Sequence, residues 1–502
     1  MVAALRRELE TQPGAGPIEL VETHISFVLV GADTAYKIRK AVNPGFLDFS
    51  SLARRRADCE RELRLNRRLA PELYLGLAEL RGTPDAPRLD GTGPLLDCAV
   101  VMKAFDQDGL WDRLAARDEL DAAAIDSLAR QLAAFHRQAA VADPQSRFGR
   151  PEQVHAPMLD NLDALAALLS GRADALCLRR LRRREAGAFA ALAPRIEARR
   201  GAGRVRECHG DLHLGNVVRI QGRTTVFDCI EFNEDFRWID VMDEIAFMAM
   251  DLEAHARPGL AHRFVDAYLQ AAGDYDGAAV LRWYRQYRAL VRAKVAALRA
   301  RQAGQDAAGA ARPYLELAHR SGQRAAPLLL ITHGLSGSGK TTLSQGVVET
   351  LGAIRIRSDV ERKRLFGLPA LASSGSAPGA GIYDAAAGAA VQARLLEAAG
   401  AVLDGGYSAL LDATFLRRAA RDAARRLAAA RGLRFVILDF EVDGATLRER
   451  VRARAARADD ASEAGLEVLA AQMRSAEPLG SDEQRFVVRV PQAGADWSAL
   501  LA

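Results

Sequence analysis

The sequence predicts a two-domain α/β protein. An α+β N-terminal domain, with a small β-rich lobe and a larger helical lobe, is expected to precede a C-terminal domain built on a doubly wound parallel sheet. The chain of 502 residues exceeds the roughly 100 to 200 residues that one hydrophobic core usually serves. Short strand patterns give way to long helical stretches before residue 320, and after residue 327 apolar strands alternate with Ala- and Arg-rich helices. We therefore expect domains at residues 1–320 and 327–502.

The elements of the N-terminal domain follow from hydrophobic periods and turn residues. Residues 18–30 and 34–40 flank the turn signal GAD, which predicts a β-hairpin. Residues 50–70 have helical spacing, and Pro71 is expected to end that helix. Residues 95–105 read as a buried strand. Helical stretches are then expected at 119–140, 159–200 and 258–320, interrupted at 205–232 by short strands around a polar loop.

The C-terminal elements begin after a stretch of small residues and prolines at 304–327, which places the domain boundary near residue 325. The apolar segment LLLITHG, starting at Leu328, is the first expected strand. The segments AIRIRSD, SALLDATF, FVILDFEV and RFVVRV are the further expected strands, with helical patterns between them. This rhythm is typical of a parallel sheet with helices on both faces.

The composition excludes several classes of protein. Hydrophobic residues make up 49% and charged residues 26%, as in globular proteins, and no run of about 18 apolar residues predicts a membrane span. The first residues lack the apolar core of a signal peptide, so a cytoplasmic protein without a membrane partner is expected. The 5 cysteines have no CxxC spacing and are expected to be reduced. The net charge of +5 leaves a nucleic-acid partner open without supporting it, and the oligomeric state has no local signature.

The segment GLSGSGKTT fits the phosphate-binding pattern GxxxxGK[ST] and lies between an apolar strand and a helical segment. Its glycines let backbone N–H groups converge on phosphate oxygens, and the following helix N-terminus favours negative charge. Lys340 is expected to reach the β and γ phosphates of ATP, and Thr341 to ligate Mg²⁺. The expected nucleotide-binding residues are Gly334, Leu335, Ser336, Gly337, Ser338, Gly339, Lys340, Thr341 and Thr342.

Charged residues after the later strands complete this expected site. Asp359 and Asp412 each follow a strand, so both carboxylates should emerge at the edge of the sheet where ligands bind. Asp359 is the candidate to accept a proton from a substrate hydroxyl, and Asp412 the candidate to hold Mg²⁺ or contact substrate, although either could cap the next helix. Arg452 and Arg457 lie in an Arg-rich segment before an acidic turn, a pattern suited to a lid that closes on phosphates.

The loop HGDLHLGNV, residues 209–217, predicts a second site for phosphoryl transfer. It contains H-x-D-x-x-x-x-N and is followed by a strand that ends at Asp228. Phosphoryl transfer uses one carboxylate to orient the attacking hydroxyl, and an amide and a second carboxylate to hold metal ions. Asp211 is therefore the candidate catalytic residue, and Asn216 and Asp228 are the candidate metal ligands.

The C-terminal motifs, with RSD at 357–359, DATF at 412–415 and the DASEA segment, resemble the small P-loop kinases across about residues 327–500. This group of P-loop NTPase folds, with an AAA-type ATP-binding domain, includes polynucleotide 5′-kinase domains, gluconate kinase, chloramphenicol phosphotransferase and zeta toxins. The resemblance implies phosphorylation of a hydroxyl group on a small molecule or on a nucleic-acid end.

Residues 20–300 resemble the aminoglycoside phosphotransferase family, whose fold is protein-kinase-like. The segment TAYK resembles the strand motif that contacts the α and β phosphates, and its lysine is Lys37. Glu62 stands where the family places the helix partner of that lysine. Lys40 remains an alternative to Lys37, and Glu60 an alternative to Glu62.

Two departures limit what this resemblance implies. No GxGxxG loop covers the phosphates near residues 24–36, and no acidic patch matches a polycationic antibiotic. Antibiotic resistance is therefore not implied, and only the reaction class, phosphorylation of a small alcohol, carries over. His136 and His209 are expected to be structural.

A chain that joins these two units resembles fused bacterial proteins with an aminoglycoside-phosphotransferase-like and a P-loop kinase-like domain. We interpret it as a bifunctional phosphotransferase that uses ATP and Mg²⁺ to phosphorylate hydroxyl groups of small molecules. Two alternatives stay open. One is an ATP-binding sensor or scaffold with an inactive domain, and the other is a C-terminal kinase of nucleic-acid 5′ ends.

Overall fold

The computed structural model describes residues 1–12, 16–43, 47–322, 326–377, 379–457, 460–492 and 495–498. The chain forms two compact units, and each is described by itself. The first comprises Met1–Asp121, Phe135–Val154 and Glu197–Asp251, and the second comprises Ala122–Ala134, His155–Ile196 and Leu252–Ala502. The domain boundary predicted near residue 325 lies outside the described residues.

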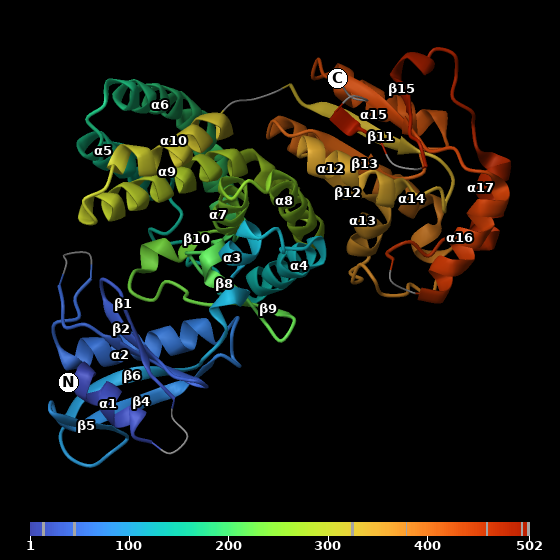
Figure 1. Ribbon diagram of the computed structural model, residues 1–502. Coiled ribbons are helices and arrows are strands. Elements are labelled where there is room, and N and C mark those ends of the chain that lie inside the picture. Colours follow the sequence, from blue (N-terminus) through green and yellow to red (C-terminus); the bar gives the residue numbers. More distant parts are fainter. Residues whose placement is uncertain are drawn as a thin grey trace. The chain divides into compact units, whose positions relative to one another are not determined.

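An antiparallel six-stranded sheet opens the first unit, in the order β1-β2-β3-β6-β4-β5 (Figure 1). Its strands are β1 (Glu19–Glu22), β2 (Ser26–Val30), β3 (Thr34–Arg39), β4 (Tyr74–Thr83), β5 (Ala86–Leu89) and β6 (Leu95–Lys103). The predicted hairpin is confirmed by β2 and β3, and the buried strand at 95–105 by β6. Residues 18–30 form two strands instead of one, because Thr23 makes a turn in which its Oγ1 accepts the N–H of Ser26 at 2.9 Å. Sequence patterns missed β4 and β5.

Two helices cover opposite faces of this sheet. Helix α1 (Val2–Glu10) packs on the face that carries Ala99, and α2 (Leu52–Asn66) packs on the face that carries Val100. Successive side chains of a strand point to opposite faces, so β6 contributes to both cores. The helix predicted at 50–70 ends earlier than Pro71, since the chain turns toward β4 after Asn66.

Two short ladders complete the first unit. The strands β7 (Val205–Glu207) and β10 (Trp238–Asp240) pair antiparallel, as do β8 (Val217–Ile220) and β9 (Arg223–Val226). The short strands expected at 205–232 are thereby confirmed, and the polar loop lies between β7 and β8. The accompanying helices are α3 (Trp111–Ala116) and α7 (Val241–Ala254), and α7 was not expected from the sequence.

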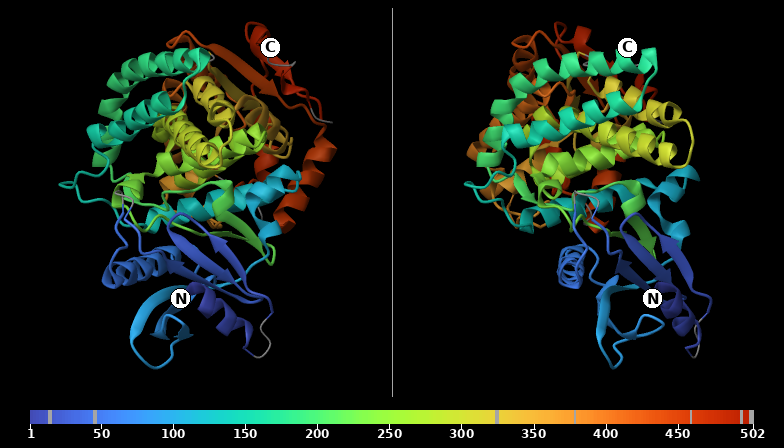
Figure 2. Two further views of the ribbon diagram at one scale, coloured as in Figure 1. Left: turned by 60° about the vertical axis from the view of Figure 1, so that its left-hand side comes forward. Right: turned by 90° about the vertical axis from the view of Figure 1, so that its left-hand side faces the viewer.

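The helical stretches predicted before residue 320 are confirmed, but two of them are divided. The helices are α4 (Ala122–Gln138), α5 (Pro151–Leu168), α6 (Arg172–Gly201), α8 (Pro258–Ala272), α9 (Ala278–Gln302) and α10 (Ala307–Ser321). Gly273 and Gly304 have positive φ and separate the last three helices, which a helical period alone does not reveal. Within the second unit α9 and α10 lie side by side (Figure 2).

The second unit contains the predicted parallel sheet, in the order β12-β13-β11-β14-β15 (Figure 1). Its strands are β11 (Leu328–His333), β12 (Ile354–Arg357), β13 (Ala409–Asp412), β14 (Arg434–Asp439) and β15 (Val487–Arg489). The helices after residue 327 are α11 (Lys340–Leu343), α12 (Gln345–Leu351), α13 (Ser358–Leu365), α14 (Ala385–Asp404), α15 (Arg418–Ala429), α16 (Gly444–Arg457) and α17 (Leu466–Ser475). All described strand pairs of this sheet are parallel, so the five carboxyl ends share one edge.

Short 3₁₀ turns connect several of these elements. They are η1 (Gln107–Gly109), η2 (Leu214–Asn216), η3 (Glu234–Phe236), η4 (Tyr275–Gly277), η5 (Gly381–Tyr383) and η6 (Gln484–Phe486). Helix α14 is the single helix of the described chain that is long and apolar enough to cross a membrane, and it packs against β12 and β13. Its apolar side chains therefore contribute to a protein core.

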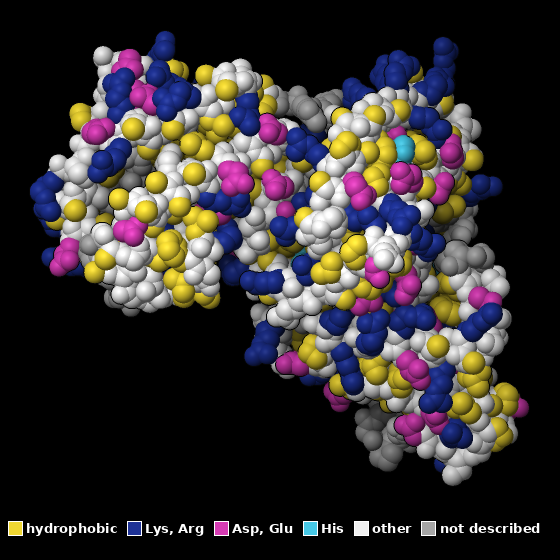
Figure 3. All heavy atoms as spheres, turned by 180° about the vertical axis from the view of Figure 1, so that it is seen from behind, with side chains coloured by type: hydrophobic (Ala, Val, Ile, Leu, Met, Phe, Trp, Pro, Cys, Tyr) yellow, Lys and Arg dark blue, Asp and Glu magenta, His cyan; other side chains and the backbone are white. Residues whose placement is uncertain are grey.

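The mixed surface charge and the free cysteine thiols agree with the expectations from the composition. Lys and Arg side chains are interspersed with Asp and Glu on the face shown in Figure 3. All five cysteines are free thiols, and Cys59, Cys98, Cys208 and Cys229 are buried. Burial raises the pKa of Cys208 well above its usual range, so this thiol stays protonated.

Candidate active sites

The polar loop of the first unit is held by a buried carboxylate. Glu244 on α7 accepts the backbone N–H groups of His209 and Gly210 at 2.7 and 2.8 Å, and its other oxygen contacts His136 Nε2 at 3.0 Å. Burial alone would raise the pKa of Glu244, but the contact with His136 and the other partners lower it to about 2. The two histidines expected to be structural thus lie at buried positions around this loop.

Gly210 permits the tight path of this loop. Its φ is +89°, and a Cβ at this position would lie 2.4 Å from the carbonyl oxygen of Phe236. Only glycine fits such a position without displacing the backbone. The loop therefore presents the next residue, Asp211, in a fixed direction.

Asp211 and Asn216, the predicted catalytic residue and one of its predicted metal ligands, lie together. Asn216 Nδ2 donates to the carbonyl oxygen of Asp211 at 2.9 Å and to its Oδ2 at 3.0 Å. His213 Nε2 lies 3.4 Å from the same carboxylate oxygen. The Asp211 side chain is 37% exposed, so it remains accessible to a substrate.

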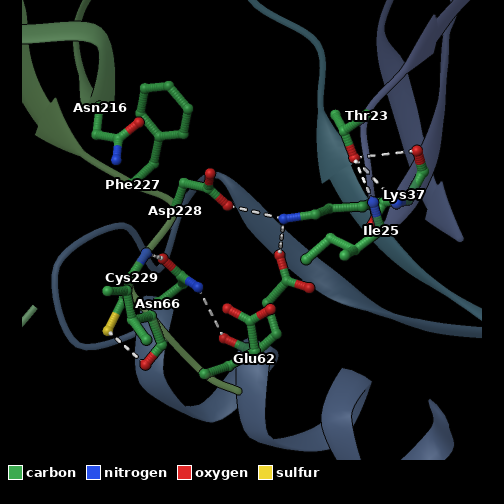
Figure 4. Close-up of polar contacts among 12 residues, drawn as sticks. Thr23, Ile25, Lys37, Glu62, Asn66, Asn216, Phe227, Asp228 and Cys229 are labelled. Carbon is green, nitrogen blue, oxygen red and sulfur yellow. Dashed lines mark hydrogen bonds and ion pairs between the residues drawn. The ribbon is translucent and has the colours of Figure 1, made fainter. Parts of the chain in front are cut away.

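Lys37 joins Glu62 and Asp228 in one cluster (Figure 4). Its Nζ lies 2.8 Å from Glu62 Oε1 and 2.7 Å from Asp228 Oδ1. Burial would raise the pKa of Asp228, but the charge and the hydrogen bond of Lys37 outweigh this effect and lower it. The two alternative residues lie elsewhere: Lys40 pairs with Glu22, and Glu60 pairs with Arg56.

The backbone at Asp228 is in an unusual conformation. Its φ is +62°, a left-handed value that side chains rarely adopt and that clusters at functional sites. The N–H of Asp228 donates to Tyr74 Oη at 3.2 Å. The following N–H, of Cys229, donates to Asn66 Oδ1 at 2.8 Å (Figure 4). These side chains hold the carboxylate toward Lys37.

A second cation, Arg39, lies beneath this cluster and was missed by the sequence analysis. Its guanidinium donates to Glu62 Oε2 at 2.7 Å and also pairs with Asp58 and Glu231. Burial raises the pKa of Glu231 to about 7, although the charge of Arg39 acts in the opposite direction. No local pattern could indicate this network, because its members are far apart in the sequence.

The segment between β1 and β2 takes the place of a glycine-rich loop. Thr23 and Ile25 lie near Lys37 in Figure 4, and Thr23 Oγ1 caps the tight turn that joins the two strands. The N–H of Lys40 donates to the carbonyl oxygen of Ile25 at 2.9 Å, which ties this turn to β3. The departure noted in the sequence therefore corresponds to a short, capped turn.

The predicted phosphate-binding loop lies between β11 and α11 in the second unit. Gly334 has φ +143°, and a Cβ there would lie 2.8 Å from the carbonyl oxygen of Phe440. Lys340 Nζ donates to the carbonyl oxygens of Gly334 and Leu335 at 3.0 and 2.7 Å. Burial lowers the pKa of Lys340 to about 8, although Asp412 and Asp359 act in the opposite direction.

Thr341 and Asp412, the two predicted metal ligands of this site, are in direct contact. Thr341 Oγ1 donates to Asp412 Oδ2 at 2.7 Å. Arg357 Nε lies 3.7 Å from the same carboxylate oxygen, and Arg357 Nη2 lies 2.7 Å from Asp460. Asp359 also lines the site, and among the described residues its carboxylate has no hydrogen-bond partner. Asp412 is therefore paired with Thr341, whereas Asp359 lines the same cavity apart from this pair.

A cavity of about 1540 Å³ extends from this loop. Its charged lining includes Lys340, Arg357, Asp359, Arg362, Asp412, Asp460 and Glu463. Arg357 lies in the RSD segment, and Asp460 and Glu463 lie in the DASEA segment, but none of the three was named as a site residue from the sequence. Arg362 lies in no motif, because acceptor pockets collect side chains from many segments. Thr342 also lines the cavity, and Gln472 Oε1 on α17 accepts the N–H of Ser336 at 3.0 Å.

Two arginines of helix α16 that were not predicted reach the cavity, and the predicted Arg452 does not line it. Arg450 and Arg454 line it, and Arg452 is exposed on another side of the helix. Positions four apart lie on one face of an α-helix, whereas positions two apart lie on nearly opposite faces. The side chain of Arg457 lies outside the described residues.

The six-stranded sheet followed by the polar loop of Asp211, and the glycine-rich loop on a parallel sheet, are both features of ATP-dependent phosphotransferases. The chain belongs to the phosphotransferase enzyme family, whose model matches residues 24–287. Residues 329–479 match a second family, described as an AAA domain. The protein is thus an ATP-dependent kinase with a P-loop domain.

Relatives and solved structures with similar chains are also known. Uncharacterized proteins of Mycobacterium tuberculosis and Mycobacterium bovis are each 31% identical over 452 residues, which cover 89% of this chain and 88% of theirs. A choline/ethanolamine kinase family protein from Mesorhizobium loti has a TM-score of 0.41 and 13% identity, covering 64% of this chain and 94% of its own. A gluconokinase from Sinorhizobium meliloti has a TM-score of 0.24 and 20% identity, covering 34% and 86%.

Proposed function

We propose that the protein is a bifunctional kinase, and that each site transfers the γ-phosphoryl group of ATP·Mg²⁺ to a hydroxyl group of a small molecule. One observation carries this proposal: each site holds a lysine together with two carboxylates, Lys37 with Glu62 and Asp228 in the first unit, and Lys340 with Asp359 and Asp412 in the second. These are the groups that phosphoryl transfer requires.

The residues present fit ATP and Mg²⁺. At the C-terminal site a side chain at Gly334 would collide with the carbonyl oxygen of Phe440, so the loop needs glycine there, and loops of this kind bind phosphate oxygens with backbone N–H groups. Thr341 and Asp412 would hold Mg²⁺ there. At the N-terminal site the amide of Asn216 and the carboxylate of Asp228 are oxygen donors of the kind that Mg²⁺ prefers.

The proton and charge of the reaction have residues to receive them. ATP supplies the phosphoryl group, so the β–γ P–O bond breaks, a P–O bond to the acceptor oxygen forms, and ADP leaves. Asp211 would take the hydroxyl proton at the N-terminal site, and Asp359 would take it at the C-terminal site. Lys37 and Lys340 would bind phosphate charge, with Arg457 as a proposed lid residue beside Arg450 and Arg454.

The test compares three proteins against a fractionated bacterial metabolite extract. Wild type, Lys340→Ala and Asp211→Ala are supplied with ATP, and phosphorylated products are identified by mass spectrometry. We expect each variant to lose a different product, which would also name the acceptors. Two variants that lose the same product, or none, would contradict two independent kinase sites.

A second candidate function is an ATP-binding sensor or scaffold in which the N-terminal site does not turn over. The short capped turn at Thr23, in place of a glycine-rich loop, favours this candidate. It predicts that Asp211→Ala changes no product while the N-terminal site still binds nucleotide. Loss of a product in that variant with retained binding would reject it.

A further inference from the structure

The parallel sheet of the second unit is bordered by a helix from outside the AAA-domain match. Helix α8 lies within residues 24–287 and packs against both α12 and β12, the edge strand of the sheet. Asp266 on α8 is 2% exposed, and its Oδ1 accepts the backbone N–H of Arg355 on β12 at 2.6 Å. The outer edge of β12 thus donates a hydrogen bond to the buried carboxylate of Asp266.

The side chain of Arg355 carries this contact to the phosphate-binding loop. Its Nη1 donates to the carbonyl oxygen of Thr341 at 2.7 Å, and its Nη2 donates to Gln345 Oε1 at 2.7 Å. Nη2 also lies 3.6 Å from Asp266 Oδ2. Arg355 is 7% exposed, so its guanidinium group binds these acceptors without competition from bulk water. A planar fork of donors suits several acceptors at once, which a lysine cannot match.

The carbonyl oxygen of Thr341, which accepts this hydrogen bond, belongs to a very short helix. The helix after the loop is broken at Ser344, so α11 is a single turn of four residues before α12 begins. Such a short helix gains little stability from its own hydrogen bonds. Arg355 binds the carbonyl of Thr341 from outside, and the hydroxyl of Thr341 points to Asp412. Thr341 is therefore fixed at both its backbone and its side chain.

A second set of contacts joins α8 to α12. Arg263 makes two hydrogen bonds to Asp126, at 2.8 and 2.7 Å, and a third to Glu349 Oε1 on α12 at 2.8 Å. Gln345 Nε2 donates to the same Glu349 oxygen at 3.1 Å. Asp126 and Arg263 also line the cavity that contains Lys340. The wall of this cavity is thus a continuous polar network that begins upstream of the P-loop domain.

We propose that Arg355 is a positioning residue of the P-loop site, which orients Thr341 for Mg²⁺, and that helix α8 orients Arg355 through Asp266. This inference rests on the proposed nucleotide binding at that site. It extends the P-loop site beyond residues 329–479, because helix α8, which lies in the region matched by the phosphotransferase family, helps to position residues of that site. Asp126 and Arg263 anchor the same helix at the cavity wall.

The test uses the full-length protein with Lys37→Met to weaken the N-terminal site, and a fluorescent ATP analogue titrated at a series of Mg²⁺ concentrations. Arg355→Met should raise the Kd for the analogue on the order of tenfold and raise the Mg²⁺ concentration needed for half-maximal binding. Asp266→Asn keeps an oxygen for the Arg355 N–H but removes the charge, and should shift both quantities in the same direction by a smaller factor. Arg355→Lys keeps the charge and should fall between wild type and Arg355→Met.

The matched control is Arg421→Met. Arg421 is 1% exposed, pairs with Glu483 in the same unit and lies outside the cavity lining. Its loss should lower the Tm without changing the Kd or the Mg²⁺ dependence. If the Arg355 and Asp266 variants behave like this control, the inference is overturned. Lys340→Ala separates the two levels: if it leaves binding unchanged, the proposed nucleotide site itself is wrong.

Discussion

The ammonium nitrogen of Lys37 lies 2.7 Å from Oδ1 of Asp228, although 191 positions separate the two residues. The contact joins strand β3 to the segment that follows the polar loop of Asp211. Lys37 is the cation shared by Asp228 and by Glu62, whose side chain is fully buried. The residue proposed to bind phosphate, Lys37, is therefore in direct contact with the proposed metal ligand Asp228.

Replacing this lysine should inactivate the N-terminal site. Lys37→Met leaves the carboxylates of Glu62 and Asp228 without their shared cation, and product formation should fall on the order of 100-fold. The measurement is the rate of the product that depends on Asp211, followed by mass spectrometry. Lys40→Met removes a neighbouring lysine that pairs with Glu22 and should retain most of the activity. Equal losses in the two variants would disprove the assignment to Lys37.

Asp211→Asn should separate chemistry from binding. The amide keeps the size of the side chain but cannot accept the hydroxyl proton, so kcat should fall on the order of 1000-fold. The Kd for ATP should change by less than about threefold, because Lys37 and Asp228 are untouched. Single-turnover rates and nucleotide titrations give the two numbers. Asp235→Asn, at an exposed residue paired with Arg147, is the control. A rate loss matched by a loss of binding would argue against a proton-accepting role.

Nucleotide affinity at the P-loop site should weaken in alkaline solution. Burial lowers the pKa of Lys340 to about 8 in the free protein, whereas bound phosphates favour the charged ammonium. Binding therefore has its full contribution below pH 8 and loses it as the pH rises above 8, at up to about tenfold per pH unit. Titrations of the fluorescent analogue from pH 7 to roughly 9.5 measure this slope. Lys340→Arg remains charged throughout and should give a flat profile, and a flat profile for wild type would contradict the prediction.

Gly210→Ala should displace the backbone of the polar loop that carries Asp211. The new Cβ would lie 2.4 Å from the carbonyl oxygen of Phe236, in addition to the strain of a positive φ. Gly222→Ala is a matched control, since Gly222 also has a positive φ of +77° but no atom within 4 Å of its Cβ position. The control should lose about 1 kcal/mol of stability from strain alone. Thermal unfolding and N-terminal activity should both show a larger loss for Gly210→Ala.

The sequence predicted what is encoded within a short segment. The loop from Gly334 to Thr342 and the spacing of Asp211, Asn216 and Asp228 each lie in one stretch, so their chemistry could be inferred before the fold. Strands of the parallel sheet were predicted for the same reason, because each is a short apolar run between helices. The pairing of Lys37 with Glu62 followed only from the family resemblance.

The remaining site residues depend on tertiary packing. Arg39 gains its role from three carboxylates on other segments, and no period or motif marks it. The choice of Arg450 and Arg454 over Arg452 depends on how α16 is rotated about its axis, which a helix rich in arginine does not reveal. Long helices were likewise predicted, but Gly273 and Gly304 divide them at points where only the backbone angles show a break.

The cover that α8 provides over β12 has a consequence for separating the two halves. A sheet edge with free N–H and C=O groups is a template for another chain, and proteins protect such edges. Without α8, the N–H of Arg355 would lose its acceptor and the flank of β12 would face water. A fragment starting at residue 327 is therefore expected to associate with itself through this strand, so the fusion of the two regions also serves the solubility of the second.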